Sequence, residues 1–260
     1  MSQQYCTVAR EGALTIITLN RPEVMNALHS PAHFELAAAF DDFAADPSQW
    51  VAIVTGAGDK AFSAGNDLKH QAGGGVMDRP ASGFAGLTMR DDLDKPVIAA
   101  VNGIAMGGGF EIALACDLII ASRNAVFALP EPRVGLAALA GGLHRLPRQI
   151  GMKQAMGMIL TGRRVGADEG RQLGFVNEVV EPAELMNAAR RWAGLILECS
   201  PMSIRASKQT VRMGLAERSV QAAMEAQARY PAVVAMRASK DFIEGPLAFS
   251  QKRKPDWKGE

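Results

Sequence analysis

Apolar residues in this chain cluster into short runs of the kind that form buried strands. The runs are rich in Val, Ile and Leu, and glycine, proline or polar residues bound them. Runs of roughly four to eight such residues predict buried strands. One predicted strand begins after Lys95-Pro96 and leads into Gly107-Gly108-Gly109, where a helix begins. Further strands are predicted at residues 13–19, 51–55, 118–121, 124–129 and 176–180.

Apolar residues at helical spacing predict helices between and after these strands. Ser30-Pro31 supplies an N-cap and a proline at the first helical position of a helix that ends before Asp46-Pro47. Recurring strand, strand and helix units indicate an α/β fold built as a spiral of ββα turns. The remaining helices are predicted at residues 153–161, 168–173, 182–200, 202–215 and 219–236.

The pattern becomes irregular between residues 71 and 95. Gly73-Gly74-Gly75 and Pro80 interrupt it, so we expect a mobile segment followed by a short helix that ends near Asp94. An ordinary surface loop would have the same composition. The pattern does not decide between the two.

Composition excludes several classes of protein. The 260 residues are 48% hydrophobic, which suits one large domain or one domain with an appendage. A net charge of +1 argues against a nucleic-acid partner, which a basic field would attract. The longest apolar stretch, residues 97–121, is interrupted by polar and charged residues, so we expect no membrane span.

The cysteines and the N-terminus indicate the compartment. Cys6, Cys116 and Cys199 are odd in number and widely spaced, which fits a reduced protein and gives no metal-ligand spacing. Residues 1–6 show neither a basic, apolar signal peptide nor an arginine-rich transit peptide. We therefore expect a cytoplasmic protein without a bound metal. The four histidines, His29, His33, His70 and His144, are expected to pack or lie on the surface.

Two glycine elements, each following a predicted strand, are the candidate anion-binding features. One is Gly107-Gly108-Gly109, and the other is centred on Gly65 in the segment 60–69. Glycines let backbone N–H groups approach a ligand closely, and a helix N-terminus adds partial positive charge. The phosphate-loop pattern is absent, because Phe110-Glu111 follows the last glycine. The two elements can each offer one N–H group to a shared oxyanion.

Glu111 and Glu131 are the candidate proton-transfer groups. A carboxylate beside an anion hole suits proton transfer better than phosphate binding. Each residue also has a structural alternative, because a glutamate near a helix start is a common cap and Pro-Glu is a common loop dipeptide. Asp67 is interpreted as a helix cap and Asp117 as structural.

Four motifs in this order and spacing resemble the enoyl-CoA hydratase/isomerase (crotonase) superfamily. They are Leu19-Asn20-Arg21-Pro22 with Asn26-Ala27-Leu28, Ser63-Ala64-Gly65-Asn66-Asp67-Leu68, Gly107-Gly108-Gly109-Phe110-Glu111, and Pro130-Glu131. The resemblance covers nearly the whole chain. It implies a crotonase-type ββα core at residues 1–200. It also implies a C-terminal helical region at residues 201–260, which forms a homotrimer or homohexamer and could contact coenzyme A.

The resemblance also implies roles for individual residues. Asn66 and Gly108 would donate backbone N–H groups to the thioester oxygen, and Glu111 and Glu131 would form an acid/base pair. No cofactor is implied beyond the acyl-CoA substrate. Substrate and coenzyme A contacts are expected at Arg21, Ala64, Asp67, Leu68 and Lys69.

Retention of both glutamates favours an enoyl-CoA hydratase, which adds water across the 2,3 double bond of a 2-enoyl-CoA. The alternatives are a Δ3–Δ2 enoyl-CoA isomerase and an acyl-CoA-binding protein without catalysis. One departure concerns the loop Leu136–Ala140: hydratases often carry a Pro-Gly pair and then Gly-Gly-Thr-Gln-Arg here, and this chain keeps Gly141-Gly142 and Arg145 but lacks the proline and has an apolar loop. This loop and the segment 71–95, which lines the acyl pocket in the family, leave the acyl group open.

Overall fold

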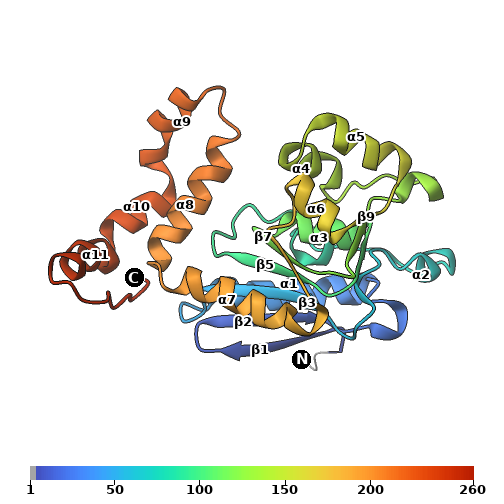
Figure 1. Cartoon of the computed structure of the whole chain (residues 1–260), viewed down its shortest axis with the longest axis horizontal. Helices are drawn as coiled ribbons and strands as arrows, with labels where there is room; N and C mark the ends of the chain where they lie inside the picture. The colour runs from blue at the N-terminus through green and yellow to red at the C-terminus, as the bar shows by residue number, and fades with distance from the viewer. Residues whose placement is uncertain (1–3) are drawn as a thin grey trace.

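Two β-sheets form the framework of the protein in a computed structural model that describes residues 4–260 (Figure 1). The larger sheet has six strands in the order β1-β2-β3-β5-β7-β10, parallel except where β1 pairs with β2. Its strands are β1 (Cys6–Glu11), β2 (Leu14–Leu19), β3 (Val51–Gly56), β5 (Val97–Val101), β7 (Leu118–Ser122) and β10 (Glu178–Val180). The smaller sheet joins β4 (Ala61–Ser63), β6 (Ile104–Met106), β8 (Val126–Ala128) and β9 (Val165–Gly166).

The predicted ββα order recurs in the structure. From β3 onward, the chain repeatedly adds one strand to the larger sheet, one strand to the smaller sheet, and then a helical segment. The three turns are β3, β4 and α2 (Leu68–Ala72); β5, β6 and α3 (Gly108–Ala115); and β7, β8 and the 3-10 turn η3 (Glu131–Val134). The α/β prediction is therefore confirmed, with each helical segment following a strand of the smaller sheet.

The apolar run that leads into the three glycines is two strands, which corrects the prediction of one. It breaks at Asn102-Gly103, and β5 and β6 then belong to different sheets. The Asn102 amide donates to the carbonyl oxygens of Gly56 and Gly58, at 3.0 and 2.8 Å. These bonds hold the bend, after which β6 runs between β4 and β8 and ends just before Gly107 and α3.

The larger sheet is buried on both faces. Alternate residues such as Ile53 and Ile98 face the helix α7 (Leu185–Leu197), where they pack against Ala189. The intervening residues, such as Val54 and Ala99, face the main core. Burial on both faces is why these parallel strands appear in the sequence as continuous apolar runs.

Several predicted bounds are corrected by the structure. Ser30 is the first residue of α1 rather than its cap, and its hydroxyl donates to the Val76 carbonyl at 2.8 Å. The strand β1 was not predicted, because most of its side chains are exposed and polar. Residues 84–86 form only a 3-10 turn, η2, and no helix ends near Asp94. The α-helices not yet given are α1 (Ser30–Ala45), α4 (Gly142–Gln149), α5 (Met152–Thr161), α6 (Ala167–Leu173), α8 (Pro201–Gly214), α9 (Val220–Ala226), α10 (Pro231–Ala238) and α11 (Lys240–Ser250), and further 3-10 turns are η1 (Pro22–Val24), η4 (Pro182–Glu184) and η5 (Gln227–Arg229).

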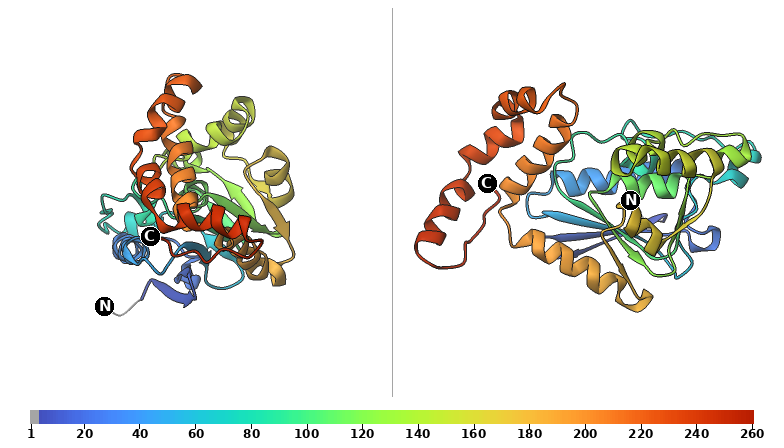
Figure 2. Two further views of the ribbon diagram at one scale, coloured as in Figure 1. Left: turned by 90° about the vertical axis from the view of Figure 1, so that its left-hand side faces the viewer. Right: turned by 45° about the horizontal axis from the view of Figure 1, so that its top comes forward.

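The last four helices lie to one side of the two sheets (Figures 1 and 2). The single helix predicted at 219–236 is broken at Tyr230, whose extended backbone precedes Pro231, and α11 was not predicted. Proline fits the first position of a helix but cannot continue one. Many apolar side chains on α8–α11 are exposed, among them Val211, Ile243 and Phe249. Within residues 4–260, no helix is both long and apolar enough to cross a membrane.

Candidate active site

The two predicted glycine elements meet in the structure. Gly65 has φ +85°, and a Cβ there would lie 2.6 Å from the Met106 carbonyl oxygen and 2.8 Å from the Gly108 nitrogen. Only glycine allows the backbone of the Gly65 element to come this close to the start of α3. The fold therefore brings together the two segments that were predicted to share one anion.

The backbone N–H groups of Asn66 and Gly108 have no hydrogen-bond partner within residues 4–260. Leu28 pairs with Asn66 as a parallel bridge, because Leu28 N–H donates to the Gly65 carbonyl at 2.8 Å and its carbonyl accepts from Asp67 N–H at 2.9 Å. The N–H of Asn66 must then point away from Leu28. Gly108 stands at the N-terminus of α3, where helix N–H groups are free. Both groups can therefore donate a hydrogen bond to an oxyanion.

Glu111 lies in the first turn of α3 and is 3% exposed. Its Oε1 accepts a hydrogen bond from the Gly142 N–H at 2.8 Å. Burial raises the pKa of Glu111 to about 7, and the charge of Glu131 adds to this, while the Gly142 and Ala140 N–H groups oppose it. Near neutral pH this carboxyl is present in both protonation states.

Glu131 opens the 3-10 turn η3, separated from the end of β8 by two residues, and reaches Gly107. A Cβ on Gly107 would lie 2.8 Å from Glu131 Oε1, so the carboxyl rests against the start of α3. Its other oxygen, Oε2, is buried without a partner among residues 4–260. Burial raises the pKa of Glu131 as well. The Glu131 carboxyl thus lies beside the backbone that carries the free Gly108 N–H, and its charge acts on the carboxyl of Glu111 in the same helix.

The N-terminal motif holds the Asn66 element in place. Arg21 Nη1 donates to the Ala27 carbonyl at 2.6 Å and to Asp67 Oδ2 at 3.0 Å, and its side chain is only 14% exposed. Asp67 also caps α2 by accepting from the His70 N–H, as predicted. Leu68 and Lys69 are exposed and Ala64 is half-buried. Their contacts with coenzyme A, like those of Arg21 and Asp67, stay predictions.

The structure adds two residues that the sequence did not single out for this site. Gly142 holds Glu111 through its N–H, and Phe84 lies so close to Gly108 that a Cβ on Gly108 would overlap its ring. Gly141-Gly142 was visible in the sequence as a glycine pair that persists beside the altered loop. Phe84 lies in the segment 71–95, where the irregular pattern gave no signal for a buried aromatic residue.

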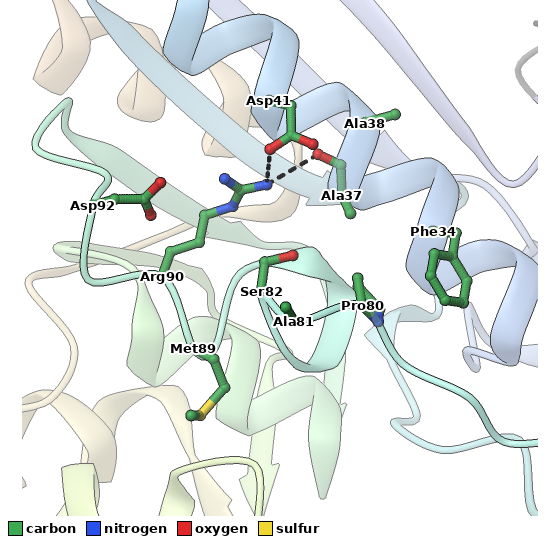
Figure 3. A pocket seen from close by; sticks show the side chains of 10 residues that line it. All are labelled: Phe34, Ala37, Ala38, Asp41, Pro80, Ala81, Ser82, Met89, Arg90 and Asp92. Atoms are coloured by element: carbon green, nitrogen blue, oxygen red, sulfur yellow. Dashed lines mark hydrogen bonds and ion pairs between the residues drawn. The ribbon is translucent and has the colours of Figure 1, made fainter.

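A separate cleft of about 510 Å³ opens between α1 and residues 80–92 (Figure 3). Arg90 spans it, donating through Nη2 to the Ala37 carbonyl at 3.0 Å and to Asp41 at 2.6 Å. Neither Glu111 nor Glu131 lines this cleft. No residue of either glycine element lines it, and its charged residues Arg90 and Asp41 are paired with each other, so we assign no chemistry to it. Within residues 4–260 there is also no cluster of three His, Cys, Asp or Glu that could hold a metal ion.

Comparisons with known proteins agree with this geometry. A family model described as enoyl-CoA hydratase/isomerase matches residues 9–260. Carnitinyl-CoA dehydratase of Escherichia coli K12 is 46% identical over 259 residues, which is 97% of each chain. A crystal structure of enoyl-CoA hydratase from Mycobacterium tuberculosis H37Rv superposes with a TM-score of 0.92 at 37% identity, covering 98% of this chain and 99% of that one. An enoyl-CoA hydratase from Bacillus anthracis gives 0.89 at 36% identity, with 99% and 100% covered.

Proposed function

Because the chain belongs to the enoyl-CoA hydratase/isomerase family, we propose that it adds water across the 2,3 double bond of a 2-enoyl-CoA. The observation that carries this proposal is that the Glu131 carboxyl rests against Gly107 at the start of α3 and its charge acts on the carboxyl of Glu111, in the first turn of the same helix. Two carboxyl groups beside an oxyanion site supply what hydration of a conjugated double bond requires. The reverse reaction, loss of water from a 3-hydroxyacyl-CoA, uses the same groups.

The thioester oxygen binds between the N–H groups of Asn66 and Gly108. Negative charge builds on this oxygen as the enolate forms, so donors already in position stabilise the transition state more than the substrate. Losing one such donor typically lowers the rate by about 10²–10³-fold. The free backbone donors of the structure support these roles.

The two carboxyl groups act on one water molecule. One takes a proton as the water oxygen attacks Cβ, and the other delivers a proton to Cα. A pKa of about 7 for Glu111 leaves it able to accept or to donate near neutral pH. Since the charges of Glu111 and Glu131 interact, the pair titrates as a unit, and neither step is assigned to one residue.

Coenzyme A binding and assembly are further parts of the proposal. The exposed side chains of Leu68 and Lys69 and the backbone at Ala64 are available for contact, whereas Arg21 and Asp67 contribute by holding this element. We place the catalytic core at residues 1–200 and the oligomer-forming region at residues 201–260. The exposed apolar side chains of α8–α11 support a homotrimer or homohexamer.

Carnitinyl-CoA is a second candidate substrate, because relatives named carnitinyl-CoA dehydratase are 45–46% identical over nearly the whole chain. The reaction class would be the same, since dehydration is hydration in reverse. The difference lies in the acyl group, which the shared glutamates do not specify.

The test is incubation of the purified protein with crotonyl-CoA, followed by mass spectrometry of the acyl-CoA. We expect a gain of one water. Glu111→Gln and Glu131→Gln should each lower the rate by about 10²–10⁴-fold, because each removes one proton-transfer group. Glu217→Gln, at an exposed glutamate without an ion pair within residues 4–260, is the matched control and should keep the wild-type rate.

Other outcomes would favour the alternatives. Conversion of a 3-enoyl-CoA to its 2-enoyl isomer without uptake of water, surviving loss of one glutamate, would indicate an isomerase. Tight binding of acyl-CoA with no change in a panel of enoyl substrates would indicate a binding protein.

A further inference from the structure

Arg79 lies beside the proposed oxyanion site. Its guanidinium carbon is 5.2 Å from the centre of the Phe84 ring, and that ring packs against Gly108. Phe84 is buried, whereas Arg79 is exposed. The Phe84 ring therefore lies between the exposed guanidinium of Arg79 and the Gly108 backbone, where the thioester oxygen would bind.

The guanidinium of Arg79 has no ion pair and no hydrogen bond within residues 4–260. Arg90, in the same segment, also lies over an aromatic ring, that of Phe40, but its donors are used: it bonds the carbonyls of Gly86 and Ala37 and pairs with Asp41. An arginine carries five donors in a fixed fork that suits a carboxylate. Arg79 keeps all of them available, held in place only by its stacking on Phe84.

The groups around Arg79 leave its charge unmatched. Burial raises the pKa of Glu111 and the charge of Arg79 opposes that rise, but the two side chains form no ion pair. Glu111 Oε1 accepts from the Gly142 N–H, and its carboxyl is required for proton transfer. His33 packs on Phe84 and is neutral, because burial lowers its pKa to about 4. The Nδ1 of His33 accepts from the Ala85 N–H at 3.0 Å, so the proton lies on Nε2, which is buried without a partner in the described chain. Arg79 and His33, which both pack on the Phe84 ring, thus offer hydrogen-bond donors and no free acceptor.

We propose that Arg79 binds a carboxylate on the acyl chain, so that the preferred substrates are CoA thioesters of dicarboxylic 2-enoic acids. This inference rests on the proposed function, because that function places the thioester at Gly108. A coenzyme A phosphate is the other possible anion. The whole pantetheine arm separates the phosphates from the thioester, however, and Arg79 lies next to the thioester position rather than at the far end of that arm.

The same arrangement disfavours a quaternary ammonium group such as the one in a carnitinyl chain. Sites for such groups use open aromatic faces, to which the cation is attracted. The ring of Phe84 is already occupied by a guanidinium, and a second cation there would be repelled by the first. The Phe84 ring therefore offers no site for the quaternary ammonium group of carnitinyl-CoA, the second candidate substrate.

Binding of saturated acyl-CoA thioesters tests this inference without turnover. Succinyl-, glutaryl- and adipyl-CoA each carry a terminal carboxylate at a different reach, and butyryl-, valeryl- and hexanoyl-CoA are neutral counterparts. By calorimetry we expect at least one carboxylate ligand to bind about 10- to 100-fold more tightly than its neutral counterpart, as charge-assisted bidentate bonds provide. Arg79→Gln should remove this preference, and Arg79→Glu should reverse it. Arg218→Gln, at an exposed arginine in the α8–α9 connection, should retain it.

Two results would overturn the inference. One is equal affinity for every carboxylate ligand and its neutral counterpart in the wild-type protein. The other is an equal loss of affinity for all six ligands and for free coenzyme A in Arg79→Gln, which would assign Arg79 to a phosphate. Failure of the proposed function is distinct from both, because it would show as a preference for carboxylate ligands in a protein that hydrates neither crotonyl-CoA nor glutaconyl-CoA.

Discussion

The two glutamates stand in regions of very different construction. Glu111 belongs to a buried helix, and the N–H of Gly142 holds one of its oxygens. Glu131 begins a 3-10 turn at the end of a three-residue strand, and one of its oxygens has no partner within residues 4–260. The segment after Glu131 is largely exposed and includes the apolar side chains of Leu136 and Leu139.

This difference separates two requirements of the site. On the α3 side, the main core fixes the backbone donors and one carboxyl, so that small changes in backbone position should disturb the chemistry. On the η3 side, backbone bonds such as that from the Leu136 N–H to the Glu131 carbonyl hold the turn, but the loop beyond it is largely exposed and can differ more easily. Preorganised donors contribute most where they cannot relax. Substitutions of equal size should therefore have unequal effects in the two regions.

Among substitutions that leave both glutamates in place, the largest effect is expected from Gly65→Ala, which acts on the α3 side. A methyl group there would lie 2.6 Å from the Met106 carbonyl oxygen and 2.8 Å from the Gly108 nitrogen, at a backbone φ of +85° that alanine rarely adopts. The two oxyanion donors would move apart. We expect kcat/KM for crotonyl-CoA to fall by about 10²–10³-fold, as for the loss of one donor.

The control for Gly65→Ala is Gly151→Ala, before α5. Gly151 has φ −59°, and a Cβ there would meet nothing within 4 Å. Its activity should stay within about twofold of wild type, because surface changes of this kind are close to neutral. A wild-type rate in Gly65→Ala would show that the close contact of the glycine elements does not position the donors.

A second effect concerns stability and its dependence on pH. The pKa of Glu111 rises from 4.5 to about 7 on folding, because the carboxyl is buried. The folded protein then binds more protons than the unfolded chain between these values, so its stability falls as pH rises through this window. We expect Glu111→Gln to become more stable relative to wild type between pH 5 and pH 8 by about 2–3 kcal/mol. Denaturant unfolding at one fixed protein concentration measures this difference.

Glu131→Gln provides the comparison for that experiment. Glu131 is half-buried, and its pKa is raised by burial in the same direction. Its pH-dependent gain should have the same sign and be smaller than that of Glu111→Gln. A stability difference for Glu111→Gln that is the same at pH 5 and pH 8 would contradict the burial of a charged carboxyl.

Much of the α3 side could be predicted from the sequence, because its signals are local. Glycines beside apolar runs mark backbone that must come close to something, and they indicated both oxyanion elements. The α/β fold followed from the periodicity of the apolar residues. The break at Asn102-Gly103 could not be predicted, since it depends on bonds to Gly56 and Gly58, which the topology alone brings near.

The contacts that complete the site are long-range, and the sequence did not reveal them. Gly142 reaches Glu111 across a separation of 31 residues, and Phe84 reaches Gly108 from an irregular segment. Arg79 had no feature in its neighbourhood that distinguished it from a surface arginine. The C-terminal helices were misjudged for a different reason, because Pro231 marks both the end of one helix and the start of the next.

The smallest effect is expected on the η3 side, from Leu139→Ser. Leu139 is 76% exposed, so its side chain contributes little to the core, and the free energy of unfolding should change by less than about 0.5 kcal/mol. Leu129, just before Glu131, is fully buried, and Leu129→Ala should cost about 2–5 kcal/mol. If the loop only bounds the acyl group, Leu139→Ser should keep the rate with crotonyl-CoA and raise KM for longer acyl chains. A marked loss with crotonyl-CoA would mean that this loop positions Glu131, and the two sides of the site would then be equally constrained.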